Sequence, residues 1–150
     1  HAAAYEMNYL GRILLEDCKE PLHFKYMPHA VFTEPEIASV GITEQKAKEK
    51  NIKYVTSTTN WLASAKAMST RLHYPVTKFL INPDNYEILG CHMIGPESST
   101  MMHQVLAVMH INNDVRHIKE MLYIHPALSE ALLPAAVAAV KEVEKYNKKS

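Results

Sequence analysis

Residues 76–96 read VTKFLINPDNYEILGCHMIGP, and this stretch decides the fold class. Residues 76–81 and 87–94 are predicted strands, each short and rich in apolar side chains. Between them, Asn82-Pro83-Asp84-Asn85 is a strong turn signal, because Asn, Pro and Asp each favour turn conformations. Gly95-Pro96 ends the second strand. We therefore predict an antiparallel β-hairpin.

Further strands are predicted on the N-terminal side of the hairpin. Residues 54–60 are rich in Thr and Val, a composition typical of strands. Two short apolar runs, over residues 29–33 and 37–42, are interrupted by Glu34-Pro35. Residues 62–70 fit neither a helix nor a strand clearly.

Two helices are also predicted in this half of the chain. Residues 2–18 carry apolar side chains at helical spacing, and residues 19–28 are a predicted connecting loop. Thr43 is a predicted N-cap of a short charged helix over residues 44–51. Glu44 lies in its first turn, where the helix dipole favours a negative charge.

Three helices are predicted after the hairpin, over about residues 98–111, 114–122 and 129–146. Each begins at a residue type that caps helices: Ser98 or Ser99, Asp114, and Ser129. Pro134 is predicted in the second turn of the last helix, where it would remove a hydrogen bond and bend the helix. The order of elements predicts an α+β fold, a mainly antiparallel sheet with helices packed on it.

Composition limits the classes of partner. The chain has 150 residues, enough for one domain, and its 16 basic and 16 acidic side chains cancel. A nucleic-acid surface would need a clustered basic excess, and a membrane span would need about 20 consecutive apolar residues. The two cysteines, Cys18 and Cys91, fit no metal or redox spacing, so we expect reduced thiols and a cytoplasmic protein.

The segment with the most chemical information is YIHPALSE, residues 123–130. His125 is the side-chain type best suited to proton exchange near neutral pH. Glu130 lies about one turn away and can fix the tautomer of the imidazole by accepting from one ring nitrogen. Pro126 holds His125 on a bend. From spacing alone a loop histidine is the commoner outcome, so the pair is a hypothesis.

Several blocks, in order, resemble one family. The run HPALSE resembles the HPTLSE signature of dihydrolipoamide dehydrogenases and mercuric reductases, which are pyridine nucleotide-disulfide oxidoreductases. The run VFTEPEIASVG (residues 31–41) resembles the opening of that family's dimerisation domain, and TEQKA (43–47) the helix that follows. Lys78-Phe79 with ILGCHMIGP (88–96) resembles its central hairpin. The resemblance covers roughly residues 29–135 and is nearest to dihydrolipoamide dehydrogenase.

The resemblance implies a fold, a division of the chain and a role. Residues 29–150 would form the dimerisation domain, and residues 1–28 a helix and linker from the end of a preceding FAD domain. The chain begins at His1 in what reads as the middle of a helix, so we expect a longer parent protein. That parent would be a homodimeric, FAD- and NAD-linked enzyme acting on a dithiol or disulfide such as lipoamide.

The resemblance also assigns the site. His125 would be the acid/base and Glu130 its orienting partner, with His125 and Pro126 near the flavin of the partner subunit. The bond before Pro126 is expected to be cis. Ala127 replaces the usual Thr of the signature, which puts local hydrogen bonding in question. ESSTM (residues 97–101) has no acidic residue at the end of the block, where the family often has a Glu, so any contact made by that Glu is in question.

Parts of the family's machinery are missing from the sequence. The four glycines form no Gly-x-Gly, and there is no Cys-x₄-Cys pair. A dinucleotide site of the usual kind needs a Gly-rich turn. We therefore expect no FAD or NAD bound by this chain alone, and no activity from it alone. His103 and His110 share a helix face, but two histidines without a third ligand do not predict a metal site.

Two other interpretations stay open. One is a stand-alone dimerisation or binding module without redox activity, and the other is a related reductase with another disulfide or a metal ion as substrate. An upstream coding sequence with the redox cysteines and a Gly-rich turn would decide for the flavoenzyme. We also predict self-association through the hairpin and the last three helices.

Overall fold

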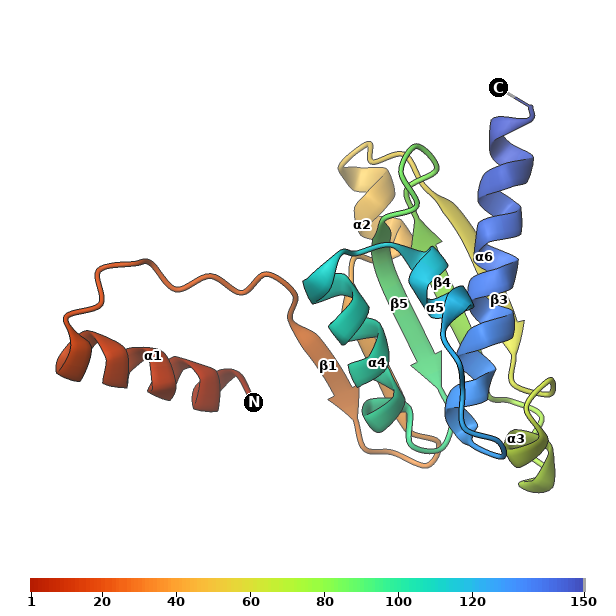
Figure 1. Ribbon diagram of the computed structural model, residues 1–150, viewed down its shortest axis with the longest axis horizontal. Helices are drawn as coiled ribbons and strands as arrows, with labels where there is room; N and C mark the ends of the chain where they lie inside the picture. Colours follow the sequence, from red (N-terminus) through yellow and green to blue (C-terminus); the bar gives the residue numbers. More distant parts are fainter. Residues whose placement is uncertain (150) are drawn as a thin grey trace.

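In the computed structural model, which describes residues 1–149, the chain folds around one five-stranded antiparallel sheet of order β1-β2-β5-β4-β3 (Figure 1). The strands are β1 (Pro28–Val31), β2 (Ile37–Gly41), β3 (Val55–Asn60), β4 (Val76–Ile81) and β5 (Ile88–Ile94). The predicted hairpin, β4 and β5, supplies the fourth and third strands in that order, so it lies inside the sheet. The predicted α+β class with an antiparallel sheet is confirmed.

Side-chain amides build the hairpin turn. The Oδ1 atom of Asn82 accepts from the N–H of Asp84 at 3.0 Å, and Oδ1 of Asn85 accepts from the N–H of Glu87 at 3.0 Å. The N–H of Asn82 also donates to the carbonyl of Glu87 at 2.9 Å. These bonds are the physical basis of the turn signal in the sequence. The second strand begins at Ile88, one residue later than predicted.

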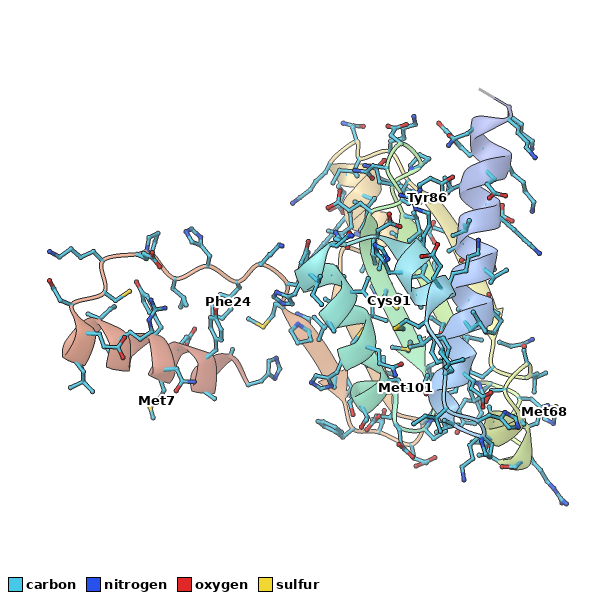
Figure 2. All side chains as sticks on the ribbon, in the orientation of Figure 1. Met7, Phe24, Met68, Tyr86, Cys91 and Met101 are labelled. Atoms are coloured by element: carbon cyan, nitrogen blue, oxygen red, sulfur yellow. The ribbon has the colours of Figure 1, made fainter. Side chains whose placement is uncertain are left out.

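The helices after β1 are α2 (Glu44–Glu49), α3 (Ala65–Ser69), α4 (Ser98–Ile111), α5 (Val115–Glu120) and α6 (Leu132–Asn147), with a 3-10 helix η1 (Leu128–Ala131) before α6. Helices α4, α5 and α6 form a layer on one face of the sheet (Figure 1). Val40, Cys91 and Phe79 are aligned across three neighbouring strands and are at most 1% exposed. They form the core with α4, α5 and α6, and Cys91 lies inside this layer (Figure 2).

The N-terminal helix stands apart from the sheet. Helix α1 (Ala2–Glu16) has no buried residue, and residues 17–27 connect it to β1 as an extended segment (Figure 1). Met7 is 73% exposed and points away from the rest of the chain (Figure 2). The helix ends at Glu16, because Asp17 adopts the left-handed conformation at φ 52°; the predicted end at Cys18 was two residues too late.

The C-terminal helices differ from the prediction at their starts. The predicted N-cap Asp114 is confirmed, and so is Thr43, which accepts from the N–H of Lys46. Ser129 begins no α-helix; it lies in η1, and α6 starts at Leu132. Pro134 is therefore in the first turn of α6, where an N–H has no partner within the helix. The predicted loss of a hydrogen bond within the helix was wrong for this reason, and the predicted bend stays a prediction.

Two more findings complete the fold. Residues 62–70, for which the sequence predicted neither a helix nor a strand, contain α3. Its N-cap is Ser64, whose Oγ accepts from the N–H of Ala67 at 3.3 Å. Neither Ser98 nor Ser99 caps α4 with its side chain; the N-cap is Glu97, which makes no such bond. Over the described residues, no helix is long and apolar enough to cross a membrane.

Candidate acid/base site

His125 and Glu130 are in direct contact. The Nδ1 atom of His125 lies 2.8 Å from Oε1 of Glu130. The other carboxylate oxygen, Oε2, accepts from the backbone N–H of Ala127 at 2.8 Å. The site is built where the chain turns from α5 into η1 and α6, and the peptide between His125 and Pro126 is cis, as expected. Both predicted residues are thus brought together.

The contact fixes the tautomer of the imidazole. The hydrogen bond from the Ala127 N–H, followed by that from His125, lowers the pKa of Glu130, so the carboxylate is ionised near neutral pH. An ionised carboxylate can only accept, so the proton of the neutral ring must be on Nδ1. The lone pair is then on Nε2. This is the arrangement that a general base requires.

The imidazole is open to solvent, whereas its partner is sheltered. The side chain of His125 is 68% exposed and that of Glu130 is 20% exposed. The apolar neighbours Leu122 and Ile124 are 100% and 81% exposed. An imidazole with a free nitrogen, close in sequence to exposed apolar side chains, is suited to act on a group presented by another surface.

The replacement of Thr by Ala at position 127 leaves half of a capping box. Glu130 accepts from the N–H of Ala127, but the methyl side chain of Ala127 offers no acceptor in return. The carbonyl of Ala127 instead accepts from the hydroxyl of Ser64 at 3.0 Å. Both backbone polar groups of Ala127 are therefore hydrogen-bonded, although its side chain offers no acceptor.

Cys91, His110 and Trp61 have packing contacts. Cys91 is fully buried, and burial raises the pKa of its thiol; both Cys91 and the half-buried Cys18 are free cysteines. The ring of His110 packs edge-on against Tyr26, with 5.3 Å between ring centroids. Among residues 1–149, no three or more His, Cys, Asp or Glu side chains are grouped to hold a metal ion. Trp61 is 1% exposed and packs within the hydrophobic core.

Sequence reasoning missed Ser64 and Glu36. Ser64 precedes an alanine-rich segment, so its role as an N-cap could have been found, but its bond to Ala127 joins residues 63 positions apart. Glu36 accepts from the N–H of Ser99, also 63 positions away. Local patterns give no signal for either contact.

Comparison with known proteins identifies the family. Residues 27–136 match the family described as pyridine nucleotide-disulphide oxidoreductase, dimerisation domain. The chain is 32% identical over 118 residues to the mitochondrial dihydrolipoyl dehydrogenase of Schizosaccharomyces pombe, covering 79% of this chain and 23% of that protein. It is 34% identical over 110 residues to dihydrolipoyl dehydrogenase 2, chloroplastic, of Arabidopsis thaliana, covering 71% and 19%.

Solved structures agree on the fold. The flavoprotein disulfide reductase RclA of Escherichia coli superposes with a TM-score of 0.80 at 24% identity, over 87% of this chain and 30% of that one. LpdA of Mycobacterium tuberculosis gives a TM-score of 0.73 at 20% identity, over 84% and 28%. The chain spans about a quarter of the length of the curated relatives. It belongs to the dimerisation-domain family of the pyridine nucleotide-disulphide oxidoreductases.

Proposed function

We propose that this chain is the dimerisation domain of an FAD-dependent, NAD-linked disulfide oxidoreductase of the dihydrolipoamide dehydrogenase type, in which His125 and Glu130 form the acid/base pair. The observation that carries the proposal is the 2.8 Å contact between Nδ1 of His125 and Oε1 of Glu130, with Nε2 left free at an exposed position. Family membership supports the reaction class.

The proposed proton transfer follows from thiol chemistry. Nε2 of His125 takes the proton from one S–H of a dithiol, and the resulting thiolate attacks a disulfide sulfur. One S–S bond forms, the original S–S bond breaks, and the leaving sulfur departs as a thiolate. Glu130 holds the imidazolium that forms, because its ionised carboxylate accepts from Nδ1. The disulfide would lie on another part of the parent protein.

The cofactors are proposed to lie on other domains. FAD and NAD, bound to other domains of the parent protein, would supply the two-electron redox chemistry that follows the thiol-disulfide exchange. A dinucleotide site needs a parallel strand-helix-strand unit with a Gly-rich turn. All strand pairs in the described part of the chain are antiparallel, so these residues do not fit such a site. Residues 1–28 are proposed to be the end of the FAD domain, with residues 29–150 as the dimerisation domain.

A homodimer is the proposed functional unit. Leu122 and Ile124, which flank His125, are almost wholly exposed, and apolar side chains so placed favour coverage by a partner. Pro126 and His125 are proposed to face the flavin of that partner. Lipoamide is the proposed substrate. The alternative is a related reductase whose substrate is another disulfide or a metal ion. The cytoplasmic location stays a prediction.

The test uses the full-length product of the gene that encodes this chain. His125→Gln should keep the flavin and lose dithiol-dependent NAD reduction by about 100-fold or more, the range expected for a general base. His117→Gln is a matched control, because His117 is also exposed and hydrogen-bonded, to Asn112 at 2.7 Å. Full turnover by His125→Gln would overturn the proposed role. A product without flavin or dithiol turnover would favour a stand-alone dimerisation or binding module.

A further inference from the structure

Ser64 makes a directed hydrogen bond to the candidate site. It is 1% exposed, and its Oγ lies 3.0 Å from the carbonyl oxygen of Ala127. A carbonyl has no proton, so the hydroxyl must be the donor. The hydroxyl oxygen of Ser64 also accepts from the N–H of Ala67 at 3.3 Å. The single proton of Ser64 is therefore committed to Ala127, and an acceptor lone pair to the start of α3.

The hydroxyl is fixed to the core of the domain. The N–H of Ser64 donates to the carbonyl of Trp61 at 2.9 Å. The indole Nε1 of Trp61 donates to Oγ1 of Thr77 in β4 at 2.9 Å, and both residues are buried. A continuous set of hydrogen bonds therefore joins the central sheet to the carbonyl of Ala127.

Both backbone polar groups of Ala127 are held, one on each side. Its carbonyl accepts from Ser64, and its N–H donates to Oε2 of Glu130, whose Oε1 contacts His125. A shift of Ala127 would therefore move the carboxylate that orients the exposed imidazole. Small displacements of a reacting group are costly, since an error of about 1 Å can lower a rate about 100-fold.

We infer that Ser64 is a positioning residue for the His125–Glu130 pair: its hydroxyl fixes Ala127 relative to the sheet and so sets the direction in which Nε2 of His125 points. Ser64 touches no reacting atom and acts only through Ala127 and Glu130. The inference rests on the proposed function for its effect on turnover, but its effect on the geometry of the pair can be measured independently.

The variants separate positioning from simple helix capping. Ser64→Ala removes both the bond to Ala127 and the cap of α3. Thr43→Ala is the matched control, because it removes the hydroxyl cap of another short helix, α2. Ser64→Thr keeps a hydroxyl and should restore what Ser64→Ala loses.

Two readouts are measured. The first is the ¹⁵N chemical shift of His125 Nδ1 in the 150-residue chain, assigned with His125→Gln, which reports the hydrogen bond to Glu130. The second is kcat/KM for the dithiol, measured in the full-length flavoenzyme. NADH oxidation by an artificial acceptor is measured with it as a reaction that does not use the dithiol. Ser64→Ala should move the Nδ1 resonance and lower kcat/KM for the dithiol about tenfold, with the acceptor reaction unchanged. Thr43→Ala should change none of these.

The outcomes distinguish a failure of the positioning role of Ser64 from a failure of the proposed function. A Nδ1 resonance at the wild-type position in Ser64→Ala overturns the positioning role, whatever the turnover. A resonance that moves, together with full dithiol turnover by His125→Gln, supports the positioning role and overturns the proposed function. A shift of equal size in Thr43→Ala would show a general effect of cap loss and would also overturn the positioning role.

Discussion

The carboxylate of Glu36 caps helix α4 from a distant part of the chain: its Oε2 accepts from the backbone N–H of Ser99 at 2.9 Å. Glu36 lies between β1 and β2, so this bond connects the edge of the sheet to the start of the helix that covers it. An ionised acceptor at a helix N-terminus is favoured by the unpaired N–H groups and by the dipole.

Glu36→Ala should therefore destabilise the domain by about 1 kcal/mol, the usual effect of losing an N-cap acceptor. Glu36→Gln, which keeps an oxygen acceptor without the charge, should cost less. The free energy of unfolding in urea measures both. Glu34→Ala, two residues away and exposed, is the control, and an equal loss in that variant would contradict a capping role for Glu36.

Thr77→Val should destabilise the domain by about 1–3 kcal/mol, because it leaves the buried indole N–H of Trp61 without its acceptor. The shape of the side chain is nearly conserved, so the loss reports the hydrogen bond. Thr58→Val on the exposed side of β3 is the matched control and should cost much less. Equal midpoints of thermal unfolding for the two variants would argue against this role of Thr77.

Gly95→Ala should destabilise the domain by more than about 1 kcal/mol. Gly95 has φ +151°, and an added Cβ would lie 2.7 Å from the ring of Trp61. Gly11→Ala is the opposite case, because nothing lies within 4 Å of an added Cβ there and alanine favours a helix. Thermal unfolding should therefore occur at a lower temperature only in Gly95→Ala. A stable Gly95→Ala domain would mean that the ring of Trp61 can move aside.

Acid should weaken the domain in part through Glu44. Its carboxylate accepts from Nζ of Lys78 and from the hydroxyl of Tyr54 at 3.2 Å, and the bond from Lys78 contributes most to lowering its pKa below 4.5. Because the folded-state pKa is the lower one, the unfolded chain binds this proton first as pH falls. The stability from Glu44 is present above about pH 4.5 and is lost as pH falls through the lowered value.

Urea unfolding as a function of pH measures this dependence. Glu44→Gln should flatten the loss of stability on the acid side of pH 4.5, and Lys78→Ala should flatten it to a similar degree, since either change removes the pair. An unchanged slope in both variants would show that other carboxylates account for the acid sensitivity.

Glu130→Gln should lower dithiol turnover of the full-length enzyme by roughly 10–100-fold and spare NADH oxidation by an artificial acceptor. The amide can still accept from one neighbour, so the loss should be smaller than in His125→Gln. Glu142→Gln, at a partly exposed position in the second half of α6, is a control of the same type. Dithiol turnover equal to wild type in Glu130→Gln would show that the imidazole is oriented without a charged partner.

Features that depend on near neighbours in the chain could be predicted from the sequence. The hairpin of β4 and β5 follows from its turn amides, and the His125–Glu130 contact joins residues five positions apart on one bend. The tertiary structure alone decided that Glu36 caps α4 and that Ser64 holds Ala127, each across 63 positions. It also decided that Pro134 lies in a first turn, because η1 takes the residues before Leu132. The physical reason is that turns and helix spacing are properties of a few consecutive residues, whereas the partner of a buried hydroxyl or a carboxylate is chosen by how the sheet and helices pack.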